Sequence, residues 1–263
     1  MIRAMGTAAS GMKAQQLNID TIANNLANVN TTGYKRSRAE FQDLLYEKVM
    51  PTGQVDAQGR AVPTRVEVGH GVKLVATNKN FSQGTVVSSG NPLDLMIEGD
   101  GFFQLSMPDG STAYTRDGSF KMDAEGSIVT SAGYRLEPAI QIPSDAVEIG
   151  ISRDGIVSVT VVGDTGNIQE IGQIELARFP NAAALQARGG NLFVQSPGSG
   201  TPILSNPGLE GLGETASGFL ELSNVETVDE LVNMITAQRA YELNSKTITM
   251  ADEMLQIVAR LKR

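Results

Sequence analysis

Residues 20–35 read DTIANNLANVNTTGYK, a helical stretch whose polar positions carry amides instead of charges. Four asparagines fall within seven residues, at positions 24, 25, 28 and 30, while apolar side chains recur around them at steps of three and four. Lysine and glutamate usually face solvent on such a helix, and asparagine is a poor helix former. Because an amide costs less to bury than a charge, we expect this polar face to pack against further protein.

The same helix extends back to the first residue. Residues 1–30 contain no proline and predict one helix with a heptad-like apolar seam. Gly33 can adopt a positive φ beyond the helix end, so a stop and hinge are expected at Thr31, Thr32, Gly33 and Tyr34. The seam and the amides together give the candidate assembly residues of this helix: Met5, Met12, Ile19, Ala23, Asn24, Asn25, Leu26 and Asn28.

The other end of the chain predicts a second, longer helix. Residues 223–263 lack glycine and proline, and Thr227 with Glu230 fits a capping box. Two apolar seams run along this segment, which indicates more than one apolar neighbour. The seams supply the candidate assembly residues Met234, Tyr241, Ile248, Met250, Met254, Leu255, Val258 and Leu261.

Between the two helices the chain changes to short β-rich runs separated by turns. Segments such as MPDGST, TRDGSF and SRDGIV place Asp-Gly between apolar runs, which favours hairpins and an antiparallel sheet. NAAALQA predicts one short helix. Residues 46–65 read as an extended loop that could reach a neighbouring subunit and stiffen an assembly, marked by Pro51, Gly53, Gly59 and Pro63.

The expected fold class is therefore α+β. Long terminal helices pair as a coiled-coil-like element, and extended connectors join them to a central antiparallel all-β domain. The expected division is a helical domain of residues 1–30 and 225–263, a connector of 31–65 and 195–224, and a β-rich outer domain of 66–194.

Composition excludes several function classes. The net charge of the 263 residues is −8, so no basic excess favours nucleic acid. The first 30 residues hold two bases and one acid, and residues 225–263 hold five bases and six acids, so the acidic excess lies in the middle. Without cysteine there is no disulfide or thiolate metal site, and no apolar run is long enough for direct membrane insertion. We expect no cofactor, no metal site and no catalytic residues.

Two readings of the helices stay open from periodicity alone. The terminal helices could pair and then pack into copies of themselves, which would use the amide face and both seams. They could also form an ordinary helical hairpin that caps the β domain.

Four stretches of the sequence carry a family resemblance. TAASGMKAQQLNIDTIANNLANVNTTGYKRSRAEFQDLLYE at the start and SNVETVDELVNMITAQRAYELNSKTITMADEMLQ at the end resemble the bacterial flagellar rod and hook protein family, and match its distal-rod members best. GDGFFQL and YTRDGSFKMDAEGSIVTSAGYRL resemble the family's β domain. Together these segments span most of the chain.

The resemblance implies a structural subunit, not an enzyme. It implies helical polymerisation into a rigid drive shaft that surrounds an export channel and transmits motor torque to the hook. The terminal helices would form the inner tube, with β domains outside. The implied partners are further copies, proximal-rod proteins below, hook protein above, the surrounding rings and the export apparatus. The implied location is the periplasm-spanning rod of the flagellar basal body, reached by type III export without a cleaved signal peptide.

The alternatives are another axial subunit, of the proximal rod or the hook, and a secreted, non-polymerising adhesin with a helical stalk. A secreted wall hydrolase would need an acid/base pair, and no motif selects one.

Overall fold

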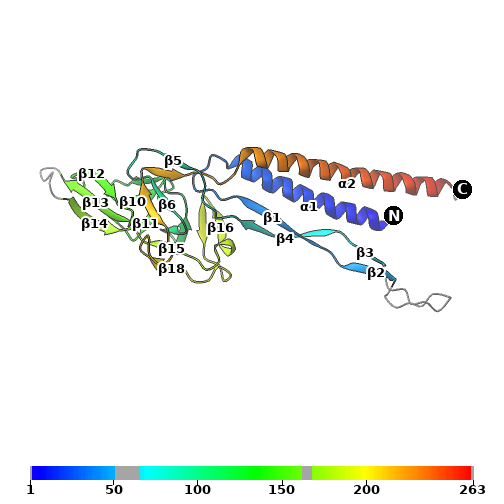
Figure 1. Cartoon of the computed structure of the whole chain (residues 1–263), viewed down its shortest axis with the longest axis horizontal. Coiled ribbons are helices and arrows are strands. Elements are labelled where there is room, and N and C mark those ends of the chain that lie inside the picture. Colours follow the sequence, from blue (N-terminus) through cyan, green and yellow to red (C-terminus); the bar gives the residue numbers. More distant parts are fainter. Residues whose placement is uncertain (1, 51–65, 162–167, 262–263) are drawn as a thin grey trace. The chain divides into compact units, whose positions relative to one another are not determined.

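The computed structural model describes residues 2–50, 66–161 and 168–261, and its contacts divide the chain into two compact units (Figure 1). The first unit comprises residues 1–26, 37–78 and 226–263, and the second comprises 27–36 and 79–225. This division differs from the expected connector. Residues 27–36 and 195–224 group with the β structure, whereas 37–78 group with the helices. The predicted loop residues Pro51, Gly53, Gly59 and Pro63 lie outside the described residues.

Two antiparallel helices and two strand pairs form the first unit. Helix α1 (Ile2–Ala27) lies beside α2 (Thr227–Leu261) in Figure 1, so both expected helices are confirmed with slightly shorter bounds. Strand β1 (Ser37–Asp43) pairs with β4 (Val72–Lys79). Strand β2 (Tyr46–Met50) pairs antiparallel with β3 (Val66–Gly69).

The second unit is built around a nine-stranded sheet. Its strands are β7 (Phe102–Ser106), β8 (Thr112–Thr115), β9 (Phe120–Met122), β10 (Ile128–Thr130), β11 (Arg135–Glu137), β15 (Leu176–Arg178), β16 (Gln186–Gly189), β17 (Leu192–Val194) and β18 (Ile203–Ser205). The order is β16–β17–β8–β7–β11–β10–β9, and β15 pairs with both β7 and β18. The paired strands of this sheet run antiparallel, which confirms the expected antiparallel β-rich region.

Smaller sheets complete this unit. They are a three-stranded sheet and two strand pairs: β12 (Ala146–Ile151), β13 (Ile156–Val161) and β14 (Ile168–Gln173); β6 (Leu95–Glu98) with β19 (Glu214–Ser217); and β5 (Val86–Ser88) with β20 (Phe219–Glu221). The short helix expected at NAAALQA is a single 3₁₀ turn, η1 (Ala182–Ala184), which leads directly into β16.

The Asp-Gly turns are hairpins in two of the three cases quoted above. Gly110 closes β7–β8 and Gly155 closes β12–β13, and each has a positive φ. The hairpin expected at Asp117-Gly118 is wrong, because β8 and β9 are not neighbours in the sheet. A Cβ on Gly118 would lie 1.6 Å from the carbonyl oxygen of Leu95. This glycine therefore permits a close crossing of two chain segments instead of a tight turn.

The hydrophobic core lies in the second unit. Phe103 and Leu105 of β7 are fully buried among apolar side chains from the surrounding strands. A separate aromatic cluster contains Phe102, Tyr114 and Phe179, where the rings meet edge to face. Burial on both faces explains why two consecutive aromatic residues, Phe102 and Phe103, stand in β7.

Candidate assembly interface

The two helices meet through small and polar residues. Near one end of the pair, Nδ2 of Asn25 lies 3.4 Å from Oε2 of Glu230, and each residue is 1% exposed. Further along, a Cβ on Gly11 would lie 3.0 Å from Nδ2 of Asn244. Glycine at this position therefore leaves room for the Asn244 side chain against α1.

The hydrogen bonds of Asn25 explain why an amide stands at this position of the helix. Its Nδ2 donates to the carbonyl oxygen of Ser37 at 2.8 Å, and its Oδ1 accepts from the Ser37 backbone N–H at 2.9 Å. The side chain thus satisfies both backbone groups of Ser37 at the start of β1, as a neighbouring strand would. Only a neutral amide offers both a donor and an acceptor in this geometry.

The other amides have different surroundings. Asn24 is exposed. Asn28 lies in the second unit, half-buried, where its Oδ1 accepts from the Thr31 hydroxyl at 3.2 Å. The amide face therefore does not act as one surface.

The buried stripe of α1 differs from the seam read from the sequence. The buried residues are Ala8, Ala14, Ile22 and Asn25. The predicted seam lies around the helix from this stripe, with Met5, Met12, Ile19 and Leu26 half-buried and Ala23 exposed. The buried stripe combines two alanines with Ile22 and Asn25, and the larger apolar side chains of the predicted seam are left only half-buried.

Helix α2 buries one seam only in part. Ala237 and Ala251 are buried, whereas Met234, Ile248 and Leu255 are half-buried. Among the residues of α2 that the structure describes, the exposed large apolar side chains are Val228, Leu231, Val232, Ile235, Tyr241, Leu243, Met250, Met254, Ile257 and Val258. The side chain of Leu261 lies outside the described residues. We refer to this set as the outer apolar face of α2.

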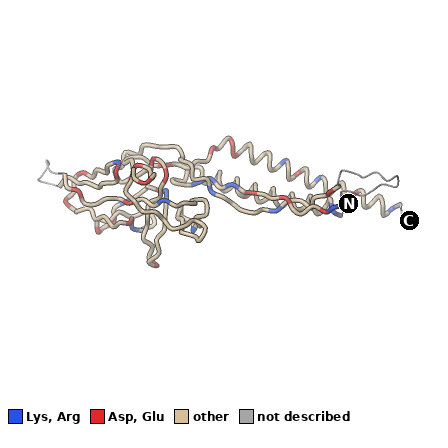
Figure 2. Tube along the Cα trace, turned by 60° about the horizontal axis from the view of Figure 1, so that its bottom comes forward, with Lys and Arg blue, Asp and Glu red and all other residues tan. Residues whose placement is uncertain are grey.

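The two helices differ in their charges. Arg3, Lys13 and Asp20 are the charged residues of α1, whereas Figure 2 shows charges of both signs along α2. An exposed helix face with this many large apolar side chains is unusual for a monomeric soluble protein and indicates an interaction surface.

The predicted hinge residues lie in the second unit, where they are held to the end of β20. Gly33 has φ of +67° and its N–H donates to the carbonyl oxygen of Glu221 at 2.8 Å. The carbonyl oxygen of Thr32 accepts from Asn191 Nδ2 at 2.9 Å. Tyr34 is buried, and the Lys79 ammonium lies 4.9 Å from its ring centroid. The expected helix stop is therefore a fixed connection within this unit.

A buried charge cluster anchors that connection. Nζ of Lys35 lies 2.6 Å from Oε1 of Glu221 and donates to the Ser82 carbonyl oxygen at 2.7 Å. Nη1 of Arg116 lies 3.4 Å from Oε2 of the same carboxylate. The Gly84 N–H also donates to Oε1, at 2.8 Å. One carboxylate thus holds two cations and one backbone donor where water is excluded.

Burial lowers the pKa of Lys35, although the adjacent Glu221 carboxylate opposes this effect. Burial likewise lowers the pKa of Arg116. Sequence analysis missed this cluster. Its available signal was weak: Glu221 and Arg116 are single charges inside short β runs, a pattern that is common at solvent-facing strand positions.

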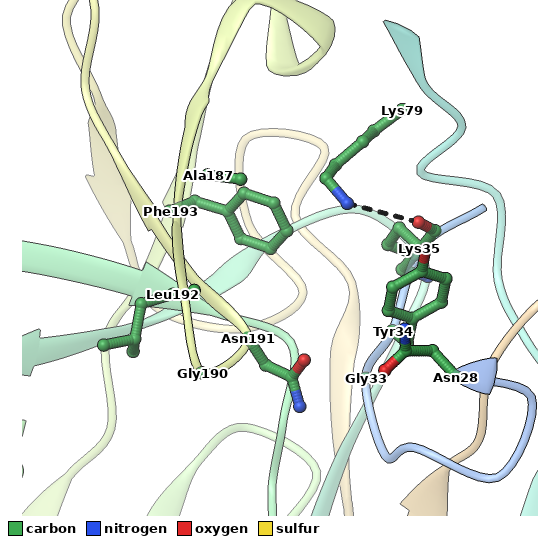
Figure 3. A pocket seen from close by; sticks show the side chains of 11 residues that line it. Asn28, Gly33, Tyr34, Lys35, Lys79, Ala187, Gly190, Asn191, Leu192 and Phe193 are labelled. Atoms are coloured by element: carbon green, nitrogen blue, oxygen red, sulfur yellow. Dashed lines mark hydrogen bonds between the residues drawn. The ribbon is translucent and has the colours of Figure 1, made fainter. Parts of the chain in front are cut away.

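A pocket of about 200 Å³ lies beside this cluster, entirely within the second unit (Figure 3). Tyr34 and Phe193 line it, and the Lys79 side chain extends between them toward the carbonyl oxygen of Lys35, which lies 3.5 Å from Nζ. Desolvation lowers the pKa of Lys79. The lining offers no acid/base pair.

The described residues contain neither a membrane-spanning helix nor a cluster of metal ligands. No helix there is both long enough and apolar enough to cross a membrane. No group of three or more potential metal ligands was found in the same residues. His70, the single histidine of the sequence, lies 3.7 Å from Glu47 at the exposed end of β3.

Comparison with known proteins matches the same segments. The family model "Flagella basal body rod protein" matches residues 5–35, and "Flagellar basal body rod FlgEFG protein C-terminal" matches 216–261. "Flagellar hook protein FlgE/F/G D1 domain" matches 96–159. The flagellar basal-body rod protein FlgG of Borreliella burgdorferi is 52% identical over the full length of both chains. The chain belongs to the flagellar basal-body rod protein family.

Other rod-family members agree with this assignment. The FlgG proteins of Caulobacter vibrioides and Bacillus subtilis are 48% and 41% identical, over 99% and 100% of this chain and the whole of each relative. The distal-rod resemblance is confirmed by these full-length matches, so this rod protein is a structural subunit of the flagellar basal body. The expectation that it is not an enzyme is confirmed by its membership of a structural family.

Proposed function

We propose that the chain polymerises helically through its paired terminal helices, with the outer apolar face of α2 covered by the helices of neighbouring copies. The resulting tube is a rigid shaft around an export channel, and it transmits motor torque to the hook. The β-rich second units lie on the outside. The single observation that carries this proposal is the outer apolar face itself.

The arrangement of side chains supports this geometry. Small residues face the partner helix within one chain, so the larger apolar side chains remain for contacts with other copies. Burying a leucine or isoleucine side chain contributes about 1.5–3 kcal/mol, so a few of them from each neighbour are enough to hold a subunit in place. The terminal segments have net charges close to zero, +1 for residues 1–30 and −1 for residues 225–263, so like-charge repulsion between copies is small.

We propose that the outer apolar face of α2 contacts a different face of the next subunit. Such a contact is heterologous, and a heterologous contact that does not close generates a filament. We further propose that proximal-rod proteins lie below this filament, hook protein above it and ring proteins around it. The filament spans the periplasm after the export apparatus has delivered its subunits.

Substituting one exposed residue on each unit tests the proposal. Leu243 on α2 and Val147 on β12 are both 67% exposed, so Leu243→Asp and Val147→Asp introduce the same charge at equal exposure. We expect Leu243→Asp to block filament formation in sedimentation and negative-stain microscopy and to leave the circular dichroism spectrum of the monomer unchanged. Val147→Asp is the matched control and should polymerise like the parent.

The opposite outcome would reject the proposed mode of assembly. Leu243→Asp filaments that form at the parental concentration and rate would show that the outer apolar face of α2 is not an inter-subunit contact.

A further inference from the structure

The contact between α1 and α2 contains few large side chains that interlock and fix the register of the two helices. The positions of α2 that face α1 include Ala237, Asn244 and Ala251, which repeat every seven residues. The facing stripe of α1 contains Ala8, Gly11 and Ala14. In a helical pair the register is normally fixed by large side chains that fit between those of the partner. A seam of alanine and glycine supplies few of them, so a slide by one heptad costs little packing.

Two contacts nevertheless agree on one register. Asn25 faces Glu230, and Gly11 faces Asn244. The spacing is the same on both helices. Gly11 precedes Asn25 by fourteen residues, or two heptads, and Asn244 follows Glu230 by the same number. The antiparallel pairing is therefore continuous, and it continues with Ala237 opposite Asn18.

A slide by one heptad would preserve the small-residue seam and break the polar contact. It would also displace residues 223–225 just before α2, where Asn224 is bonded to Arg36, Asn80 and Ser82. Helix α2 would move by about 10 Å along α1, and Ala251 would replace Asn244 opposite Gly11. Asn25 would then face Ala237, and the buried Glu230 carboxylate would lose the Asn25 amide. Asn25 itself cannot follow the slide, because both of its polar atoms are bonded to the Ser37 backbone.

We propose that Asn25 and Glu230 set the register of α1 against α2. Asn25 is held in place by β1 and presents Nδ2 at one fixed point, and Glu230 is the acceptor on α2 that recognises it. Both are positioning residues within one chain. This inference does not depend on polymerisation. It adds that the position of the outer apolar face of α2 along the axis of α1 is fixed.

The chain has no cysteine, so engineered cysteine pairs report the register without background. Gly11→Cys with Asn244→Cys reports the native register, and Gly11→Cys with Ala251→Cys reports the slide by one heptad. Each pair is placed in the full-length chain and combined with Glu230→Leu, with Glu230→Gln, or with Asn24→Leu as an exposed control beside Asn25. Cross-linking is measured by mild oxidation of dilute monomer, with helix content followed by circular dichroism.

We expect Glu230→Leu to retain its helix content and to raise the ratio of shifted to native cross-link by at least about tenfold, which corresponds to about 1.4 kcal/mol of register preference. Glu230→Gln keeps an acceptor for Asn25 and should retain the native product, as should Asn24→Leu. The proposal is overturned if Glu230→Leu gives only the native cross-link. It is also overturned if Glu230→Leu loses helix content without any shifted product, because the contact would then determine stability alone.

This experiment is separate from the test of the proposed function. A chain that cross-links as expected but never forms filaments would contradict the proposed polymerisation and leave the register assignment intact.

Discussion

Removing the Glu221 carboxylate should destabilise the second unit more than any exposed charge substitution. Glu221→Leu leaves Lys35 and Arg116 as two buried cations without a counter-charge, and it leaves the Gly84 N–H without its carboxylate acceptor. Breaking a buried ion pair from one side costs about 3–5 kcal/mol, and an unsatisfied buried donor adds about 1–3 kcal/mol. Because the Arg116 contact is long and the guanidinium retains two carbonyl acceptors, at Ile97 and Gly99, we expect a total loss of about 4 kcal/mol.

The matched control is an ion pair of the same length on the surface. Nη2 of Arg135 lies 2.6 Å from Oε2 of Glu125, and both side chains are more than half exposed. Glu125→Gln should cost less than about 1 kcal/mol. Lys35→Met removes one cation and leaves Glu221 paired with Arg116, so its loss should fall between those of the other two variants.

Urea denaturation of dilute monomer, followed by tyrosine fluorescence and circular dichroism, measures these losses. For a unit of this size, about 4 kcal/mol corresponds to a fall in the melting temperature of roughly 8–16 °C. A loss in Glu221→Leu that equals the loss in Glu125→Gln would refute the reasoning, because the buried cluster would then contribute no more than a surface pair.

Three further predictions concern the core, a close crossing and the helices. Gly118→Ala should lower the free energy of unfolding by at least about 3 kcal/mol, because its Cβ would collide with the Leu95 carbonyl oxygen. Gly110→Ala, at φ of +78° in open space, should lower it by only about 1–2 kcal/mol. Thermal denaturation distinguishes the two variants. Leu105→Ala, in the fully buried middle of β7, should lower unfolding stability by about 2–5 kcal/mol, and an unchanged urea midpoint would contradict its place in the core. Deleting residues 1–30 should leave a folded, monomeric β-rich unit by sedimentation, and rods formed by this truncation would contradict assembly through the terminal helices.

Local patterns in the sequence predicted the elements well because their causes are local. The two helices follow from apolar spacing and from the absence of proline, and the hairpins at Gly110 and Gly155 follow from turn chemistry. Asp117-Gly118 was misassigned because the reason for its glycine is a distant segment, Leu95, which no local pattern records.

The candidate interface was predictable only in outline. An outer apolar face on α2 follows from its second seam, but the inner stripe of α1 does not follow from hydrophobicity. That stripe contains Gly11 and Asn25, and hydrophobic periodicity gives such residues no weight. The Lys35–Glu221–Arg116 cluster joins three segments far apart in the chain, so its pairing is set by the tertiary fold and not by any spacing.

The chain passes between its two units at four places, so neither unit is a continuous segment. The second unit needs β19 and β20 to pair with β6 and β5, and the first needs α2 beside α1. A polypeptide that emerges with its amino end first therefore cannot complete either unit until the last part of the chain is free. The nine-stranded sheet lies between residues 102 and 205 and can form earlier, but the two units become complete only with β19, β20 and α2.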